Sequence, residues 1–147
     1  MNTPAELWLH HHTDVAERGG EPVFAALMLQ IDRPATLTIS RASANPTRPQ
    51  GLVLDGELPL TIDQLVLPRL VLWSDTAPAT VSLDVEPGRL AVSHAWRDGD
   101  IVHAWTGWAG MVRHDDPDDP GHLRVAASDG HGSLTTDLEV DLRLTNR

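Results

Sequence analysis

The chain has 147 residues, of which 21 are acidic and 11 basic, so its formal net charge is −10 at pH 7. This length suits a single domain whose core is large enough to fold without disulfides, and the chain contains no cysteine. The acidic balance excludes the basic surface with which nucleic-acid binders hold phosphates. No apolar run is long enough to span a bilayer and no signal peptide is recognised, so we expect one domain over residues 1–147 in the cytoplasm.

The first residues of the chain fit either a helix or a strand. Thr3 to Glu6 form a capping-box pattern with proline at the first helical position, which indicates a helix within residues 5–16. Glu6 to His12 also alternate as an edge strand would. We favour the strand and keep the helix as the alternative.

Farther along the chain the dominant hydrophobic period is two, which is the period of β-strands. Residues 23–31 are apolar on both faces and predict a central strand, and residues 41–51, with two prolines, predict a long loop. Pro59 and Pro68 indicate an edge strand or a split one. The other predicted strands cover residues 35–40, 52–55, 58–67, 69–73, 80–85, 90–96, 101–112, 123–127 and 134–144. This spacing predicts an all-β fold, an antiparallel β-sandwich of about eight to ten strands, jelly-roll-like or immunoglobulin-like.

A tight turn at Asp98-Gly99 is the most informative local feature, because Asp-Gly between alternating apolar residues is a strong hairpin signal. A two-residue turn there would place His94 directly opposite His103, with Trp96 opposite Ile101. A three-residue loop would move the two histidines to opposite faces.

The predicted histidine pair is a candidate metal site. Side chains directly opposite in an antiparallel pair lie close enough for His94 and His103 to reach one zinc or iron ion, given a third ligand. The alternative is that both histidines are packing residues.

Tryptophans on the same predicted face are candidate ligand-binding residues. Trp96 and Trp105 share this face with the histidines, and a bulge at Gly107 would add Trp108. These rings form either part of the core or an exposed platform for a carbohydrate or a protein.

Clustered carboxylates offer a second candidate metal site, because calcium takes six to eight oxygen ligands from flexible loops. The carboxylates belong to Asp115, Asp116, Asp118, Asp119 and Asp129. The alternative is a solvated turn in which Asp and Pro set the backbone conformation.

The carboxyl-terminal hairpin is predicted from its alternation. Closing it through residues 129–132 places Leu123 opposite Leu138 on the buried face, and Arg124 opposite Asp137 on the outside.

No nucleophile elbow, phosphate-binding glycine loop or cysteine supports a covalent or nucleotide-dependent enzyme. We therefore expect a non-enzymatic binding module that engages a carbohydrate or a protein through the Trp/His face or the acidic loops. The alternatives are a metal-dependent enzyme centred on His94 and His103, and a structural subunit that forms homo-oligomers.

Overall fold

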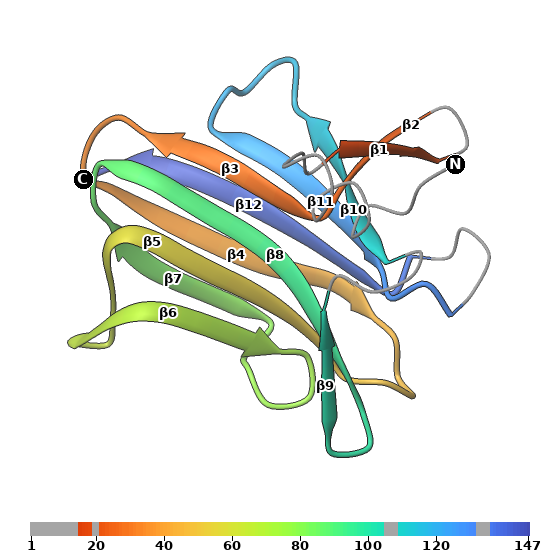
Figure 1. The fold of residues 1–147 in the computed structure, drawn as a ribbon. Helices are drawn as coiled ribbons and strands as arrows, with labels where there is room; N and C mark the ends of the chain where they lie inside the picture. Colours follow the sequence, from red (N-terminus) through yellow and green to blue (C-terminus); the bar gives the residue numbers. More distant parts are fainter. Residues whose placement is uncertain (1–14, 19–20, 105–108, 132–135) are drawn as a thin grey trace.

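The computed structural model describes residues 15–18, 21–104, 109–131 and 136–147 (Figure 1). Over these residues the fold is all-β, with twelve antiparallel strands and no helix. The all-β, antiparallel part of the predicted fold class is confirmed, with more strands than expected. In the described part of the chain, no helix is long and apolar enough to cross a membrane. The choice between strand and helix for residues 5–14 lies outside the described residues, as do Trp105 and Trp108.

The strands follow the chain with short connections. They are β1 (Val15–Arg18), β2 (Glu21–Phe24), β3 (Ala26–Ile31), β4 (Ala35–Ala44), β5 (Gln50–Ile62), β6 (Leu65–Trp73), β7 (Thr80–Val85), β8 (Gly88–Asp98), β9 (Ile101–Ala104), β10 (Gly110–Asp115), β11 (His122–Ser128) and β12 (Leu138–Asn146).

Hydrogen bonding joins the strands in the order β1-β2-β10-β11-β12-β4-β7-β5-β8-β3, with β6 added to β5 and β9 added to β8. The sheet nearly closes on itself because β2 and β3 are consecutive, with only Ala25 between them. β2 pairs with β10, whereas β3 pairs with β8. The result is a nearly closed, barrel-like sheet (Figure 1), so division into the two separate sheets of a sandwich is not confirmed.

Two of these strand pairings consist of a single residue pair. β5 meets β7 at the single pair Thr61–Asp84, and β2 meets β10 at the single pair Phe24–Met111. From Ala26 onward the chain pairs with β8, so the described residues form no ladder between β3 and β10. This gap is the seam of the sheet.

The core fills the interior with aliphatic side chains. Alternating burial confirms the period-two prediction, since every second residue is buried along β7, over residues 35–40 of β4 and over residues 138–143 of β12. Among the largest fully buried side chains are Leu37, Leu54, Leu83, Leu90, Met111 and Leu142.

The β8–β9 hairpin forms, but its predicted register is wrong. Asp98 pairs with Ile101 and Trp96 with His103, so the loop residues are Gly99 and Asp100 rather than Asp98 and Gly99. Gly99 has φ of +63°, which matches the first loop position of a type II′ turn, where glycine is preferred. The shift by one loop position removes the predicted pairing of His94 with His103.

The β11–β12 hairpin also differs in register, by four residues. Leu123 pairs with Leu142 instead of Leu138, and Arg124 pairs with Asp141 instead of Asp137. Because the shift is even, the predicted buried and exposed faces are retained. β11 ends at Ser128 and β12 begins at Leu138, so the described strands are farther apart in the chain than predicted.

The predicted strand over residues 58–67 is split, but the break lies at neither Pro59 nor Pro68, both of which are within strands. A tight turn at Asp63 and Gln64 separates β5 from β6, and Pro68 lies in β6, which pairs only with β5 among the described strands. Both turn residues have positive φ, 48° and 69°, a conformation that disfavours side chains with a Cβ atom.

Gln64→Gly should therefore stabilise the protein by about 1 kcal/mol, because glycine removes the steric cost of the left-handed conformation. Urea unfolding of the variant and the parent measures the difference. Gly99→Ala is the opposite control and should destabilise, since Gly99 also has positive φ. A Gln64→Gly variant less stable than the parent would contradict this interpretation of the turn.

Candidate functional site

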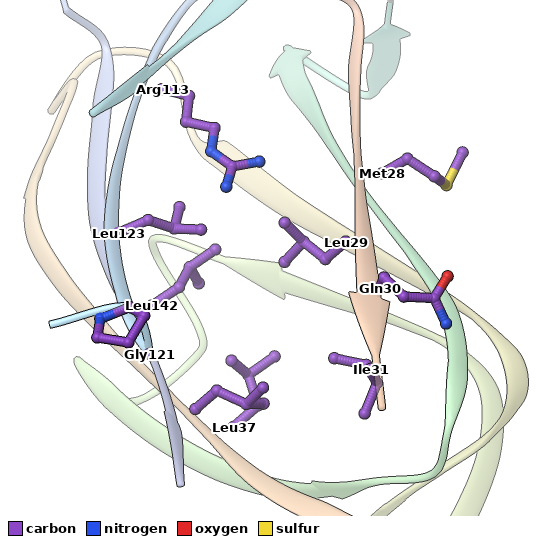
Figure 2. A pocket seen from close by; sticks show the side chains of 11 residues that line it. Met28, Leu29, Gln30, Ile31, Leu37, Arg113, Gly121, Leu123 and Leu142 are labelled. Atoms are coloured by element: carbon purple, nitrogen blue, oxygen red, sulfur yellow. The ribbon is translucent and has the colours of Figure 1, made fainter. Parts of the chain in front are cut away.

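A cavity of about 280 Å³ opens at the seam between β3 and β10 (Figure 2). Its lining comes from five strands. Leu29 and Ile31 belong to β3, Arg113 belongs to β10, and the remaining leucines belong to β4, β11 and β12. These leucines are Leu37, Leu123, Leu142 and Leu144. The cavity is therefore an extension of the core that reaches the surface.

The divergence of the strands explains the opening. β10 pairs with β2 only at Met111, and β3 then pairs with β8. Strand alternation turns Leu29 and Ile31 inward, whereas Met28 and Gln30 are more exposed. The inward leucines thus line a space that no neighbouring strand covers among the described residues.

Arg113 lies at the mouth of this cavity and was not predicted as a site residue. It pairs with Val125, which is buried, and directly opposed residues share one face of a sheet. Its guanidinium group extends over the cavity in Figure 2. Its Nε donates to Asp115 Oδ1 at 2.6 Å.

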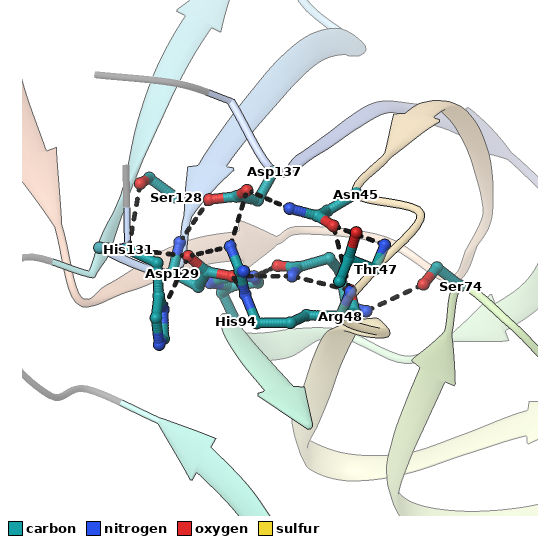
Figure 3. Close-up of polar contacts among 11 residues, drawn as sticks. Asn45, Thr47, Arg48, Ser74, His94, Ser128, Asp129, His131 and Asp137 are labelled. Atoms are coloured by element: carbon teal, nitrogen blue, oxygen red, sulfur yellow. Dashed lines mark hydrogen bonds and ion pairs between the residues drawn. The ribbon is translucent and has the colours of Figure 1, made fainter. Parts of the chain in front are cut away.

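A second cluster is polar and lies where the chain enters β5 and leaves β11 (Figure 3). At its centre is Asp129, which is 2% exposed. Arg48 Nε donates to Asp129 Oδ2 at 2.7 Å, and Gln50 Nε2 donates to the same oxygen at 3.1 Å. Burial alone would raise the pKa of Asp129, but hydrogen bonds from Arg48, the His131 backbone and Gln50 more than offset it and hold the pKa well below its usual value.

Asp137 completes the cluster from the other end of the β11–β12 loop. Its carboxylate accepts from the Asp129 backbone N–H at 2.9 Å and from Asn45 Nδ2 at 2.9 Å. Asp137 was predicted to face solvent opposite Arg124, and that prediction is wrong, since Asp137 is 4% exposed. The cluster therefore fastens both ends of the loop to the segment before β5.

His94 joins this cluster through Gln50, with 2.6 Å between His94 Nε2 and Gln50 Oε1. Because the Gln50 amide nitrogen donates to Asp129 and to the Arg48 carbonyl, its oxygen is the acceptor and His94 carries its proton on Nε2. Burial lowers the pKa of His94 to about 4, and the nearby Asp129 charge only partly opposes this. His94 is therefore neutral at pH 7.

Trp96 separates the two histidines of the predicted metal site. Its ring stacks on His94 at a centroid distance of 5.5 Å and on His103 at 5.7 Å. His94 is 3% exposed and Trp96 is 2% exposed, so these two residues belong to the interior rather than to an exposed platform. The alternative in which the large rings form part of the core is the one observed for Trp96.

The carboxylates of the acidic turn at residues 115–119 contact different partners and do not point toward a common centre. Asp115 contacts Arg113, Asp119 contacts Arg143, and Asp118 donates its backbone N–H to Asp116. His122 lies between Asp116 and Asp141, whose hydrogen bonds raise the pKa of His122. In the described part of the chain, no three His, Asp or Glu side chains are grouped so that they could hold a metal ion. The zinc and calcium sites therefore gain no support from the geometry.

Comparisons with protein-family models, with curated proteins and with solved structures produced no match. The function must therefore be inferred from the geometry of this chain alone.

Asp129→Asn should destabilise the protein by about 2 kcal/mol, because it removes the charge-assisted hydrogen bond to Arg48 and leaves this cation only the longer contact with Asp137, at 3.7 Å. Chemical denaturation at pH 7 measures the loss. Asp115→Asn removes a partner of an exposed ion pair and should cost less than about 1 kcal/mol. Equal losses in the two variants would contradict the central place of Asp129.

His94 should make the protein less stable as the pH falls. Folding lowers the pKa of His94. In the unfolded chain the imidazole is protonated below about pH 6.5, whereas in the folded chain it is protonated only below about pH 4. Stability is thus lost between these values, by about 3 kcal/mol in total. His94→Gln should remove this part of the pH dependence in unfolding measurements from pH 7 to pH 4, whereas His114→Gln, at an exposed position, should retain it. Parallel pH profiles for the parent and His94→Gln would show that His94 does not titrate in this way.

Proposed function

We propose that the protein is a non-enzymatic binding module that holds a small, largely apolar molecule in the seam cavity. The observation that carries this proposal is a space of about 280 Å³ at the edge of the core that is open to solvent and whose accessible lining is about equally apolar and polar. Ligand sites are typically concave and mostly apolar, with a few polar groups that fix orientation. The leucines of the cavity and the polar groups of Arg113 and Gln30 have this composition.

The size of the cavity limits the ligand. Since one water-sized group occupies about 30 Å³ of liquid, about nine non-hydrogen atoms fill the space. A ligand of this size binds by burying hydrocarbon against Leu29, Leu123 and Leu142.

The ligand surface predicted from the sequence is not the one we propose. Burial of Trp96 and His94 removes the carbohydrate platform at these two residues, and Trp105 and Trp108 lie outside the described residues. The cytoplasmic location and a jelly-roll-like or immunoglobulin-like arrangement remain predictions.

Self-association is a second candidate function, favoured by exposed apolar residues on two hairpins. Leu65 and Val66 on β6 are 60% and 64% exposed, and Ile101 and Val102 on β9 are 63% and 57% exposed. An edge strand with such side chains can pair with a second copy of the chain. Sedimentation velocity over a range of concentrations would detect the resulting dimer.

Binding of 1-octanol tests the cavity, because its hydrocarbon chain matches the available space. Methyl resonances of Leu29, Leu123 and Leu142 should shift in a saturable manner in NMR titrations. Leu29→Phe adds a ring at the mouth and should weaken binding at least tenfold, since the ring occupies the space of the ligand.

Leu58→Phe is the matched control, because it makes the same substitution at a residue that is 48% exposed on β5. This variant should bind octanol as the parent does. The proposal fails if the parent shows no saturable binding, or if Leu29→Phe binds octanol with unchanged affinity.

A further inference from the structure

Arg113 is the one ionisable residue among the described residues that line the cavity. Arg113 pairs with the buried Val125, so its side chain lies on the inward face of β10. Met111, two residues earlier on the same face, is fully buried. A cation on the inward face of a sheet needs water or an anion beside it, because burial of an unpaired charge is costly. At the mouth of the cavity, Arg113 is in contact with water and would also contact any molecule that enters the cavity.

The donors of Arg113 are only partly used. Nε bonds to Asp115, and no described residue accepts a hydrogen bond from Nη1 or Nη2. The side chain is 35% exposed, so these donors remain reachable from solvent. Two parallel N–H groups on a planar guanidinium match the two oxygens of a carboxylate.

Negative charges near the mouth repel an incoming carboxylate less strongly than Arg113 attracts it. Asp115 is 67% exposed, so solvent screens its repulsion of an incoming anion. The overall charge of −10 acts over distances beyond the Debye length of about 8 Å at physiological salt and is largely screened. A carboxylate in direct contact with Arg113 therefore gains more than it loses.

We propose that the seam cavity binds a medium-chain aliphatic carboxylate, with its two oxygens on Arg113 Nη1 and Nη2 and its chain against Leu29, Leu123 and Leu142. This inference rests on the proposed function and adds the chemistry of the head group. A chain of about eight carbons fills the space, with the carboxylate at the mouth.

Octanoate and 1-octanol form a matched pair of probes, since they share the chain length and differ in charge. Isothermal titration at about pH 7.5, where the carboxylate is ionised, should give octanoate about threefold to fivefold tighter binding than octanol, as expected for one partly exposed ion pair. Arg113→Gln should abolish this difference and leave octanol binding unchanged. Arg124→Gln is the control, because Arg124 lies on the adjacent strand β11 and pairs with Asp141 and Glu139. This variant should retain the preference.

A further variant tests the effect of the Asp115 charge on octanoate binding. Asp115→Asn removes the neighbouring negative charge and should tighten octanoate binding several-fold without affecting octanol. Added salt should reduce the octanoate preference of the parent, because the contact is partly exposed.

The outcomes separate this inference from the function on which it rests. Equal binding of both probes by the parent, with loss of both in Leu29→Phe, would retain the cavity and overturn the assignment of the head group. A preference for octanoate that survives Arg113→Gln would overturn the role of Arg113. Absence of binding by either probe would overturn the proposed function as well.

Discussion

One extended segment, residues 21–31, holds the two ends of the sheet together. Before Ala25 it pairs with β10, and after Ala25 it pairs with β8. The change of partner at Ala25 closes the sheet at Phe24. Beyond Ala25 the segment pairs with β8 only, so β3 and β10 are not hydrogen-bonded to each other. The core is thereby enclosed on most sides, and the cavity lies where the ladder is missing. Closure of the fold and opening of the cavity thus have the same cause.

The end of the molecule that holds Asp129 depends on ionic rather than apolar contacts. Asp129 and Asp137 bind Arg48 and Asn45 across the connection between β4 and β5, so one buried cluster fixes two loops. A buried ion pair adds little net stability over an apolar packing of similar volume, but removal of one partner is expensive. We infer that the cluster specifies the positions of these loops more than it stabilises the fold.

Local patterns in the sequence predicted most strands and faces, whereas the site depends on contacts that no local pattern contains. Residues 80–85 were predicted with the bounds that β7 has, because alternation alone defines a half-buried strand. The β8–β9 register failed because Asp98-Gly99 and Gly99-Asp100 are both acceptable hairpin loops and differ by one position. Arg48 and Asp129 are 81 residues apart in the chain, so their pairing required the fold. The inward direction of Arg113 was readable from its alternation with Met111, but the cavity beside it was not.

Arg113 also explains why the seam does not close. A ladder between β3 and β10 would satisfy backbone groups at about 1 kcal/mol per hydrogen bond and would cover Leu29 and Leu123. It would also cover the guanidinium group of Arg113, which is paired with Asp115 and partly exposed, and removing these charges from water costs several kcal/mol per ion. We infer that this desolvation cost offsets the gain from the few hydrogen bonds that so short a ladder could form, and so favours the open seam. The residue that we propose as the anchor of the ligand is therefore also the residue that keeps the entrance open.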